Sequence, residues 1–341
     1  MAAPDIIGLD IAKNTFHLHR ASGDGTVQFS KALGRNRLLE FLSDLEPCIV
    51  AMEACGRAHH WGREISKLGH DVRLIAPQYV KPYVKRLKND AVDAEAISEA
   101  ASRPTMRFVA VKSADLQGQA MTLKVRDLLM AQKVQTINAL RSHLAEFGIV
   151  VPKGIQNLGR LEQEVEAHRK SLPEAVVDLC ATLLEQIATL ADRIADLTTQ
   201  VQIISRENET AQRLRTMPGI GPITAVALAT LAPPTSTFRR GRDFAAWVGL
   251  TPKQYSTGGK TRLGRTSKMG QRDIRRFLVI GAMAVIASAR SRGGPPEGSW
   301  LSRMLAWKPR MLVAIALANK MARAAWAIIK HGGTYRIPAP A

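Results

Sequence analysis

The sequence predicts three consecutive regions: an α/β domain, a helical region and a mainly α-helical C-terminal domain. Short apolar runs alternate with helical patterns over residues 1–110, as in a sheet layered with helices. Residues 111–205 have few glycines and prolines near their two ends and show helical periodicity. Residues 206–341 are the most basic part of the chain. A chain of 341 residues is too long for one ordinary core, so we expect two or three domains.

The α/β domain begins with three short strands that predict a meander. We place them at DIIGLDIA, TFHLHRA and TVQFSKA, where apolar runs or alternation are followed by turn residues. A helix, a strand, a helix, a strand and a helix follow, at NRLLEFLSDL, CIVAMEA, HHWGREISKLGH, DVRLIAP and NDAVDAEAISEAAS. The fourth strand is continuously apolar, as expected for a buried parallel strand. This order of elements is typical of a ribonuclease H-like (RNase H-like) α/β layer fold.

The helical middle region ends in a heptad pattern. Apolar residues recur every seven positions, with a second set four positions after the first three of them, at Leu183, Ile187, Leu190, Ile194, Leu197, Val201 and Ile204. This spacing over three heptads favours a coiled-coil seam between subunits. An amphipathic helix packed within one subunit explains it equally well, because three heptads are the minimum for a coiled coil.

The charge of the chain indicates a polyanionic partner. There are 48 Lys and Arg residues against 29 Asp and Glu, a formal net charge of +19. Residues 239–276 alone contain eleven basic and two acidic residues, and two helical patterns follow, near 271–291 and 309–330. Such a balance favours nucleic acid or an anionic membrane surface as the partner.

A membrane or secreted protein is disfavoured. The apolar run at 277–289 is too short to cross a bilayer, and we expect no secretion signal at the N-terminus. Cys48, Cys55 and Cys180 are odd in number and lack metal-ligand spacing, so they are typical of reduced cytosolic thiols. We therefore expect a cytoplasmic protein without a membrane partner.

Four acidic residues of the first region are candidates for a metal site. Asp10 ends the first strand and Glu53 ends the fourth, and an acid inside an apolar strand needs a reason. Asp90 and Asp93 are one helical turn apart and face the same way. Four bare carboxylates repel one another, whereas Mg²⁺ prefers such oxygen ligands and leaves positions open for phosphate. Glu95 lies on the same helix and is the acid most easily mistaken for one of the four.

Two motifs of the last region are candidates for nucleic-acid contact. Gly219 and Gly221 in TMPGIGPITAVALATL would let backbone amides approach a phosphate, although a tight turn between helices explains them nearly as well. The segment WVGLTPKQYSTGGKTRLGRTSKMGQRDIRR holds a hydroxyl pair, two glycines and cations. Its candidate residues are Lys253, Ser256, Thr257, Gly258, Lys260, Arg262, Arg265 and Lys268. A hydroxyl in such a loop either attacks a phosphodiester or only donates a hydrogen bond to it.

The motifs GLDIAKNTF, MEACG, KNDAVDAEAI, MPGIG, FAAWVGLTP and YSTGGKTRLGRTSKMG occur in an order that resembles the Piv-type DEDD transposases of bacterial insertion sequences, the IS-one-ten group. The form STGGKTRLGRTSKMG looks most like the IS-eleven-eleven branch. The resemblance extends over about residues 5–330.

The resemblance implies a RuvC-like DEDD domain at 1–110, a coiled-coil linker for oligomerisation at 111–205 and a transposase domain at 206–341. It implies Mg²⁺ at Asp10, Glu53, Asp90 and Asp93, and a catalytic serine that forms a phosphoserine link with DNA. The implied partners are donor and target DNA, a structured guide (bridge) RNA and further copies of the chain, as a dimer or tetramer. Arg126 and Arg141 are candidates for RNA contact.

The position of the catalytic serine is ambiguous in this sequence. Many relatives have serine directly before glycine, where this chain has Thr257 before Gly258 and Ser256 one place earlier. We favour Ser256, because a primary hydroxyl is the less hindered nucleophile, with Thr257 as the alternative. The sequence thus predicts an insertion-sequence recombinase. A RuvC-like, Mg²⁺-dependent DNA endonuclease that uses water, without a covalent intermediate, is the alternative.

Overall fold

The computed structural model describes residues 5–85 and 89–336. The chain separates into two compact units, one of residues 1–117 with 233–237 and the other of residues 118–232 with 238–341. The long helices of the middle region therefore belong to the same unit as the C-terminal domain.

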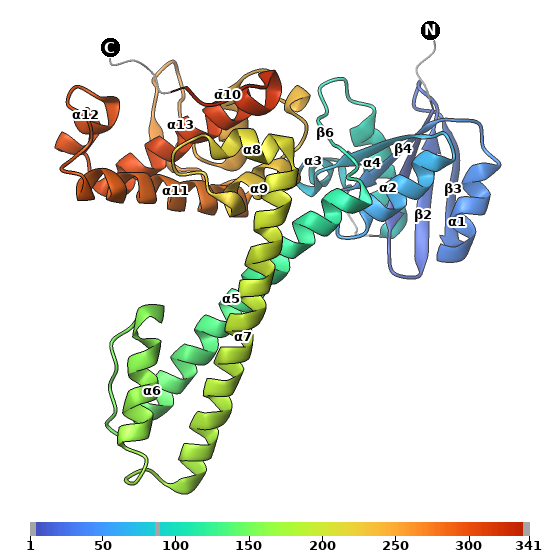
Figure 1. Cartoon of the computed structure of the whole chain (residues 1–341). Coiled ribbons are helices and arrows are strands. Elements are labelled where there is room, and N and C mark those ends of the chain that lie inside the picture. The colour runs from blue at the N-terminus through green and yellow to red at the C-terminus, as the bar shows by residue number, and fades with distance from the viewer. Residues whose placement is uncertain (1–4, 86–88, 337–341) are drawn as a thin grey trace. The chain divides into compact units, whose positions relative to one another are not determined.

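The first unit contains a six-stranded sheet in the order β3-β2-β1-β4-β5-β6 (Figure 1). The strands are β1 (Ile6–Ile11), β2 (Thr15–Ala21), β3 (Val27–Gly34), β4 (Ile49–Glu53), β5 (Asp71–Ile75) and β6 (Phe108–Val109). β1, β2 and β3 pair antiparallel, which confirms the predicted meander. β4 lies parallel to β1 and to β5, as predicted for its continuously apolar sequence. The short antiparallel strand β6 was not predicted from the sequence.

Helices cover both faces of this sheet. They are η1 (Arg35–Arg37), α1 (Leu38–Ser43), α2 (Ala58–Lys67), α3 (Pro77–Val80), η2 (Lys81–Tyr83) and α4 (Asp90–Ala101). Alternate residues of a strand point to opposite faces, so Ile7 and Leu9 pack in a core with α1 and α2. Ile6 packs in the other core, with α4.

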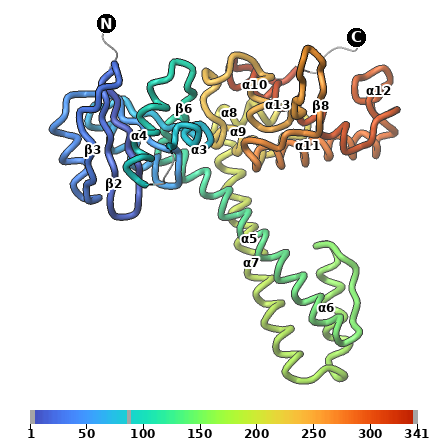
Figure 2. The backbone as a smooth tube through the Cα atoms, turned by 180° about the vertical axis from the view of Figure 1, so that it is seen from behind, coloured from blue at the N-terminus to red at the C-terminus, as the bar shows by residue number. Residues whose placement is uncertain are grey.

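The second unit begins with two long helices joined by a short one. These are α5 (Ala114–Ala145), η3 (Ile155–Asn157), α6 (Leu158–Ala167) and α7 (Glu174–Glu207), and α5 and α7 lie side by side in both views (Figures 1 and 2). Ile187 shares a buried core with Ile137 of α5, and Val201 shares another with Leu123. The chain itself thus buries part of the heptad seam, which supports packing within one subunit. A coiled coil between subunits stays a prediction.

The rest of the second unit is a helical domain with one small hairpin. It contains α8 (Glu209–Arg215), α9 (Pro222–Leu231), α10 (Gly241–Val248), β7 (Pro252–Gln254), β8 (Leu263–Thr266), α11 (Arg272–Ser291), α12 (Trp300–Trp307) and α13 (Arg310–His331). The short helix η4 (Thr235–Thr237), between α9 and α10 in the chain, belongs to the first unit. Among the described residues, α13 alone is long and apolar enough to span a membrane. Its residues Val313, Ala318 and Trp326 are buried in the core of the domain, so a packed core helix accounts for its composition.

Candidate active site

Two acidic residues lie at the ends of neighbouring parallel strands. β1 and β4 pair from Ile6 with Ile49 to Leu9 with Met52, and Asp10 and Glu53 are the next residues on each strand. Hydrogen-bonded strands are about 4.8 Å apart, so the two backbones bring these acids close together. Asp10 lies two residues beyond Gly8, and Glu53 two residues beyond Ala51. Both acids therefore face the layer that contains α4.

The first turn of α4 carries the other two acids. Asn89 caps this helix, because its side-chain oxygen accepts a hydrogen bond from the Ala91 amide at 2.7 Å. Gly8 allows α4 to lie directly on β1, since a Cβ at Gly8 would be 2.1 Å from the Ala94 carbonyl oxygen. That close approach brings Asp90 and Asp93 within electrostatic range of Asp10.

The electrostatics of Asp10 reflect this arrangement. Burial raises the pKa of Asp10, the carboxylates of Asp90 and Asp93 raise it further, and His17 lowers it. His17 lies opposite Asp10 on β2, and its Nε2 is 3.7 Å from Oδ2 of Asp90. His17 was not among the residues predicted for the site. The alternation of β2 together with the meander would have placed it beside Asp10.

Glu95 is engaged elsewhere. Its Oε1 is 2.6 Å from Nζ of Lys85, and this contact raises the pKa of that lysine. Among the described residues, no group of three or more acidic, histidine or cysteine side chains stands close enough to hold a metal ion already. The four predicted acids lie on one face of the sheet, but their carboxylates do not stand at the spacing of metal ligands.

The chemistry of this group nevertheless fits a hard divalent cation. The donors are carboxylate oxygens, which Mg²⁺ prefers, and the raised pKa of Asp10 reports unrelieved repulsion from two neighbouring carboxylates. Burial is the larger cause of that raised pKa, and the two carboxylates add to it. A cation among these acids would relieve the repulsion between them. Asp10, Glu53, Asp90 and Asp93 are the residues that would hold it.

The candidate hydroxyls lie on the hairpin of β7 and β8. Gly258 and Gly259 have φ of 53° and 75°, and the Lys260 amide donates to the Thr257 carbonyl at 3.0 Å. These values match a two-residue type I′ turn, which needs positive φ at both central positions. The glycine pair therefore has a structural role in closing the hairpin.

The hydroxyl of Ser256 forms hydrogen bonds within the hairpin. Its Oγ accepts hydrogen bonds from the Arg262 amide and from Nε2 of Gln254, each at 3.1 Å. Thr257 pairs with Lys260 through its backbone at the next position. Neighbouring residues of an extended chain point to opposite faces, so the hydroxyls of Ser256 and Thr257 lie in different environments.

Exposed cations surround this hairpin. Its exposed basic residues are Lys253, Lys260, Arg262, Arg265 and Lys268. Lys268 has φ of 53° and is the only residue other than glycine with positive φ in the described part of the chain. A lysine held in this region indicates local strain, which is common at functional sites.

The two glycines of the TMPGIG segment differ. Gly219 has φ of 83°, and a Cβ there would be 2.7 Å from the carbonyl oxygen of Gly281 in α11, so the packing of helices requires this glycine. Gly221 precedes α9 and faces open space. Helix packing accounts for Gly219, and a phosphate contact stays a prediction for both glycines.

The arginines selected for RNA contact are engaged within the chain. Nε of Arg126 donates to Oγ1 of Thr198 at 2.8 Å, and Arg141 donates to the Gly154 carbonyl at 2.6 Å. Both bonds tie α5 to other parts of the helical region, so these side chains have a structural role that the charge pattern alone did not reveal.

Comparison with known proteins identifies the class. Residues 7–149 match a model described as a transposase of the DEDD type, and residues 211–294 match one described as "Transposase IS116/IS110/IS902 family". The chain is thus a transposase, an enzyme that cuts and rejoins DNA. Transposase domains of the DEDD type are typically metal-dependent.

Full-length relatives make the assignment specific. The chain is 44% identical to a probable family 20 transposase of Pseudomonas aeruginosa, with 97% of this chain and 98% of the relative covered. It is 42% identical to the transposase for insertion sequence element IS1328 of Yersinia enterocolitica, over 97% and 98%. It is 33% identical to the transposase for element IS1111A of Coxiella burnetii, over 97% and 91%. The chain belongs to the IS110/IS116/IS902 family of insertion-sequence transposases.

Proposed function

We propose that this transposase excises and inserts its element through a Mg²⁺-dependent acidic site and a serine nucleophile, with an RNA guide. The acidic site lies on a domain that we take to be RNase H-like and RuvC-like. The observation that supports the metal-dependent part is the convergence of Asp10, Asp90 and Asp93: burial raises the pKa of Asp10, and the other two carboxylates raise it further. A divalent cation would offset the repulsion between these carboxylates, and it would also position phosphate oxygens of the DNA.

Mg²⁺ held by Asp10, Glu53, Asp90 and Asp93 would offset the charge of a scissile phosphate. The chain's own residues then have separate tasks. The exposed cations Lys253, Lys260, Arg262 and Arg265 hold the phosphate backbone and stabilise the charge that develops on the reacting group.

The proposed nucleophile is Oγ of Ser256. As Oγ attacks phosphorus it gives up its proton to solvent and an Oγ–P bond forms. The bond from phosphorus to the deoxyribose oxygen breaks, and that oxygen takes up a proton from solvent to leave as a hydroxyl. The ester keeps the energy of the phosphodiester for rejoining. The hydrogen bonds that Ser256 accepts from the hairpin fix the position of its oxygen, which supports Ser256 over Thr257.

The RNA guide and the oligomer rest on the resemblance to the family. A structured RNA that pairs with donor and target DNA would supply the sequence specificity, as in other RNA-guided systems. A dimer or tetramer of the chain, in the cytoplasm with the nucleoid DNA, completes the proposal.

A DNA endonuclease that uses water is the second candidate, and one observation favours it. In the part of the chain that the structure describes, no carboxylate or imidazole makes a hydrogen bond to Ser256. A serine hydroxyl needs an activating base. In the water mechanism the hairpin only binds DNA, and the product is never joined to the protein.

Denaturing electrophoresis separates these candidates. The protein is mixed with its element-encoded RNA, Mg²⁺ and labelled donor DNA, as wild type, Ser256→Ala, Thr257→Ala and Asp10→Ala. We expect a labelled band at the mass of the protein in the wild type and in Thr257→Ala. The band is lost in Ser256→Ala and in Asp10→Ala.

Other outcomes have definite meanings. Loss of the band in Thr257→Ala but not in Ser256→Ala would mean that the threonine is the nucleophile. Free cleaved DNA without an adduct, unaffected by either change in the hairpin, would exclude the covalent mechanism and leave the water-attacking nuclease. Formation of the adduct without RNA would remove the guide from the proposal.

A further inference from the structure

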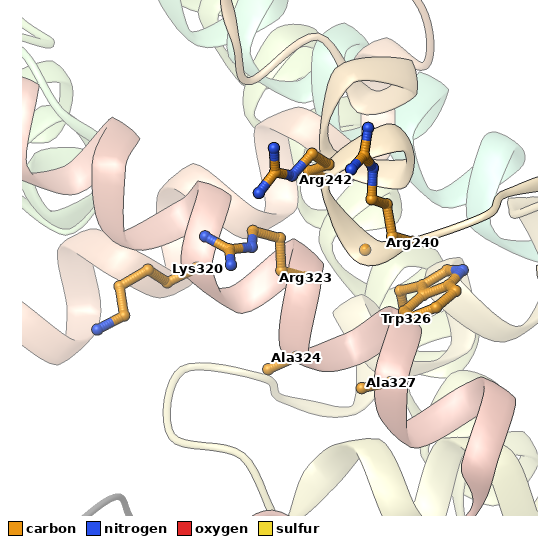
Figure 3. Close-up of a pocket in the computed structure, with 8 residues that line it drawn as sticks. Arg240, Arg242, Lys320, Arg323, Ala324, Trp326 and Ala327 are labelled. Carbon is orange, nitrogen blue, oxygen red and sulfur yellow. The ribbon is translucent and has the colours of Figure 1, made fainter.

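The C-terminal domain has a basic groove between α10 and α13, apart from the serine hairpin. Arg240 and Arg242 line it from the start of α10, and Lys320 and Arg323 line it from α13 (Figure 3). The groove has a volume of about 480 Å³ and is shallow and open to solvent. All four cationic side chains are exposed. None of the sequence motifs includes these four residues as a set.

Gly241 is a point where α10 and α13, the two sides of the groove, come close together. A Cβ at this position would be 3.0 Å from the carbonyl oxygen of Arg323 and 3.2 Å from its Cα. A side chain here would require the backbone of α13 to shift by a few tenths of an ångström, so glycine favours this close approach of α10 to α13. The approach places Arg240 and Arg242, the neighbours of this glycine, next to the cations of α13.

The positive charge of the groove is largely uncompensated. Residues 298–341 contain seven Lys and Arg and no Asp or Glu. Within residues 5–85 and 89–336, neither Arg242 nor Lys320 nor Arg323 forms an ion pair, while Nε of Arg240 lies 3.7 Å from Asp243. The amine of Lys320 lies over the ring of Trp300, 4.4 Å from its centroid.

Repulsion between cations indicates that the groove would accept an anion, and a tryptophan forms part of its wall. Burial lowers the pKa of Lys320, and Arg323 and Arg303 lower it further, so these cations repel one another. Trp326 lines the groove and is only 8% exposed, and its Nε1 has no hydrogen-bond partner among the described residues. That nitrogen is itself buried, so Trp326 contributes an apolar wall to the groove and no hydrogen bond to a ligand.

We propose that this groove is a docking site for the phosphate backbone of duplex DNA. A shallow, open, cationic groove suits a long polyanion that passes across it, because an enclosed cavity would be needed to surround a small ligand. Arginine matches phosphate geometry with paired N–H groups. DNA is chosen because the chain is a transposase. The proposal does not depend on the serine mechanism or on the acidic site.

Duplex binding by the full-length protein tests the proposal. The test variant is Arg242→Gln/Lys320→Gln/Arg323→Gln, and the control is Lys153→Gln/Arg160→Gln/Lys170→Gln, which removes the same charge from exposed sites near α6. Fluorescence anisotropy with a labelled duplex of arbitrary sequence is measured over a range of salt concentrations. We expect the groove variant to bind roughly tenfold or more weakly at about 0.1 M salt. Its slope of log affinity against log salt falls by about 2.7, or about 0.9 for each lost phosphate contact.

A charge-preserving variant guards against a folding defect. Arg242→Lys/Arg323→Lys keeps both charges, and we expect it to retain most of the affinity and the salt slope. Circular dichroism melts establish that each variant is folded. Equal weakening in the groove and control variants would overturn the proposal, because net charge alone would then explain it. Unchanged duplex binding with loss of binding to a structured RNA would also overturn it, because RNA would then be the occupant.

Discussion

Replacing Gly8 with alanine is the most direct test of how the acidic site is assembled. The new Cβ would be 2.1 Å from the Ala94 carbonyl oxygen, 2.6 Å from the Ser98 amide nitrogen and 2.9 Å from Cβ of Ser98. Ordinary contacts begin near 3.4 Å, so α4 must move away from β1 by about 1 Å or more. The two closest neighbours are backbone atoms of a helix, and the third is a Cβ fixed to that backbone, so none of them can rotate out of the way.

The magnitude has two parts. Overpacking of a core of this kind costs about 1–3 kcal/mol of the free energy of unfolding. A misplacement of about 1 Å among catalytic groups costs about 100-fold in rate, and α4 carries Asp90 and Asp93. We therefore expect Gly8→Ala to lose about 100-fold in DNA cleavage at temperatures where the protein remains folded.

The assay pairs urea unfolding with cleavage of labelled donor DNA. Gly34→Ala is the matched control, because Gly34 also lies in this sheet, has φ of −63° and has nothing within 4 Å of its added Cβ. We expect that control to be neutral or up to about 1 kcal/mol more stable. If Gly8→Ala is as stable and as active as the wild type, the packing of α4 on β1 does not position the acids.

Three further predictions follow from single residues. Asp10→Asn should abolish DNA cleavage. It should also raise the free energy of unfolding at neutral pH by about 0.5–2 kcal/mol, which urea unfolding from pH 3 to 8 would measure. The pKa of Asp10 is raised in the folded state, so the folded protein holds that proton more tightly, and the free energy of unfolding falls as the pH rises through the folded pKa. Asp10→Asn should remove this fall. The same dependence of stability on pH in wild type and variant would contradict the reasoning. Gly281→Ala should destabilise the C-terminal domain by about 1–3 kcal/mol, because its Cβ would be 2.1 Å from the Gly219 carbonyl oxygen; an unchanged thermal melt would argue against this contact. Lys268→Gly should relieve about 1 kcal/mol of backbone strain while weakening DNA binding, so a melting temperature that falls would show that the lysine side chain stabilises the fold.

Local sequence patterns were sufficient for most of the first domain. Alternation and continuous apolar runs located β1 to β5, and the positions of Asp10 and Glu53 at strand ends followed from them. The two-residue strand β6 was missed because two residues carry no periodicity. The short helix α3 was missed for the same reason.

For the candidate site too, the sequence indicated some features and not others. Chain order and strand direction indicated that the four acids share one face of the sheet. The sequence did not reveal that His17 lies 3.7 Å from Asp90, because that contact joins a strand to a helix more than seventy residues away. It also did not reveal that Glu95 is bound by Lys85.

The sequence by itself determined the elements of the first domain, the basic character and the family of this chain, because periodicity, charge and motif order are local or additive properties. Only the tertiary structure decided which charges are free to act. Arg126 and Arg141 are engaged by the chain itself, whereas Arg242 and Arg323 meet in an open groove. All four are arginines in helical segments, and the difference between them arises from which distant backbone or side-chain groups the packing brings within hydrogen-bonding distance.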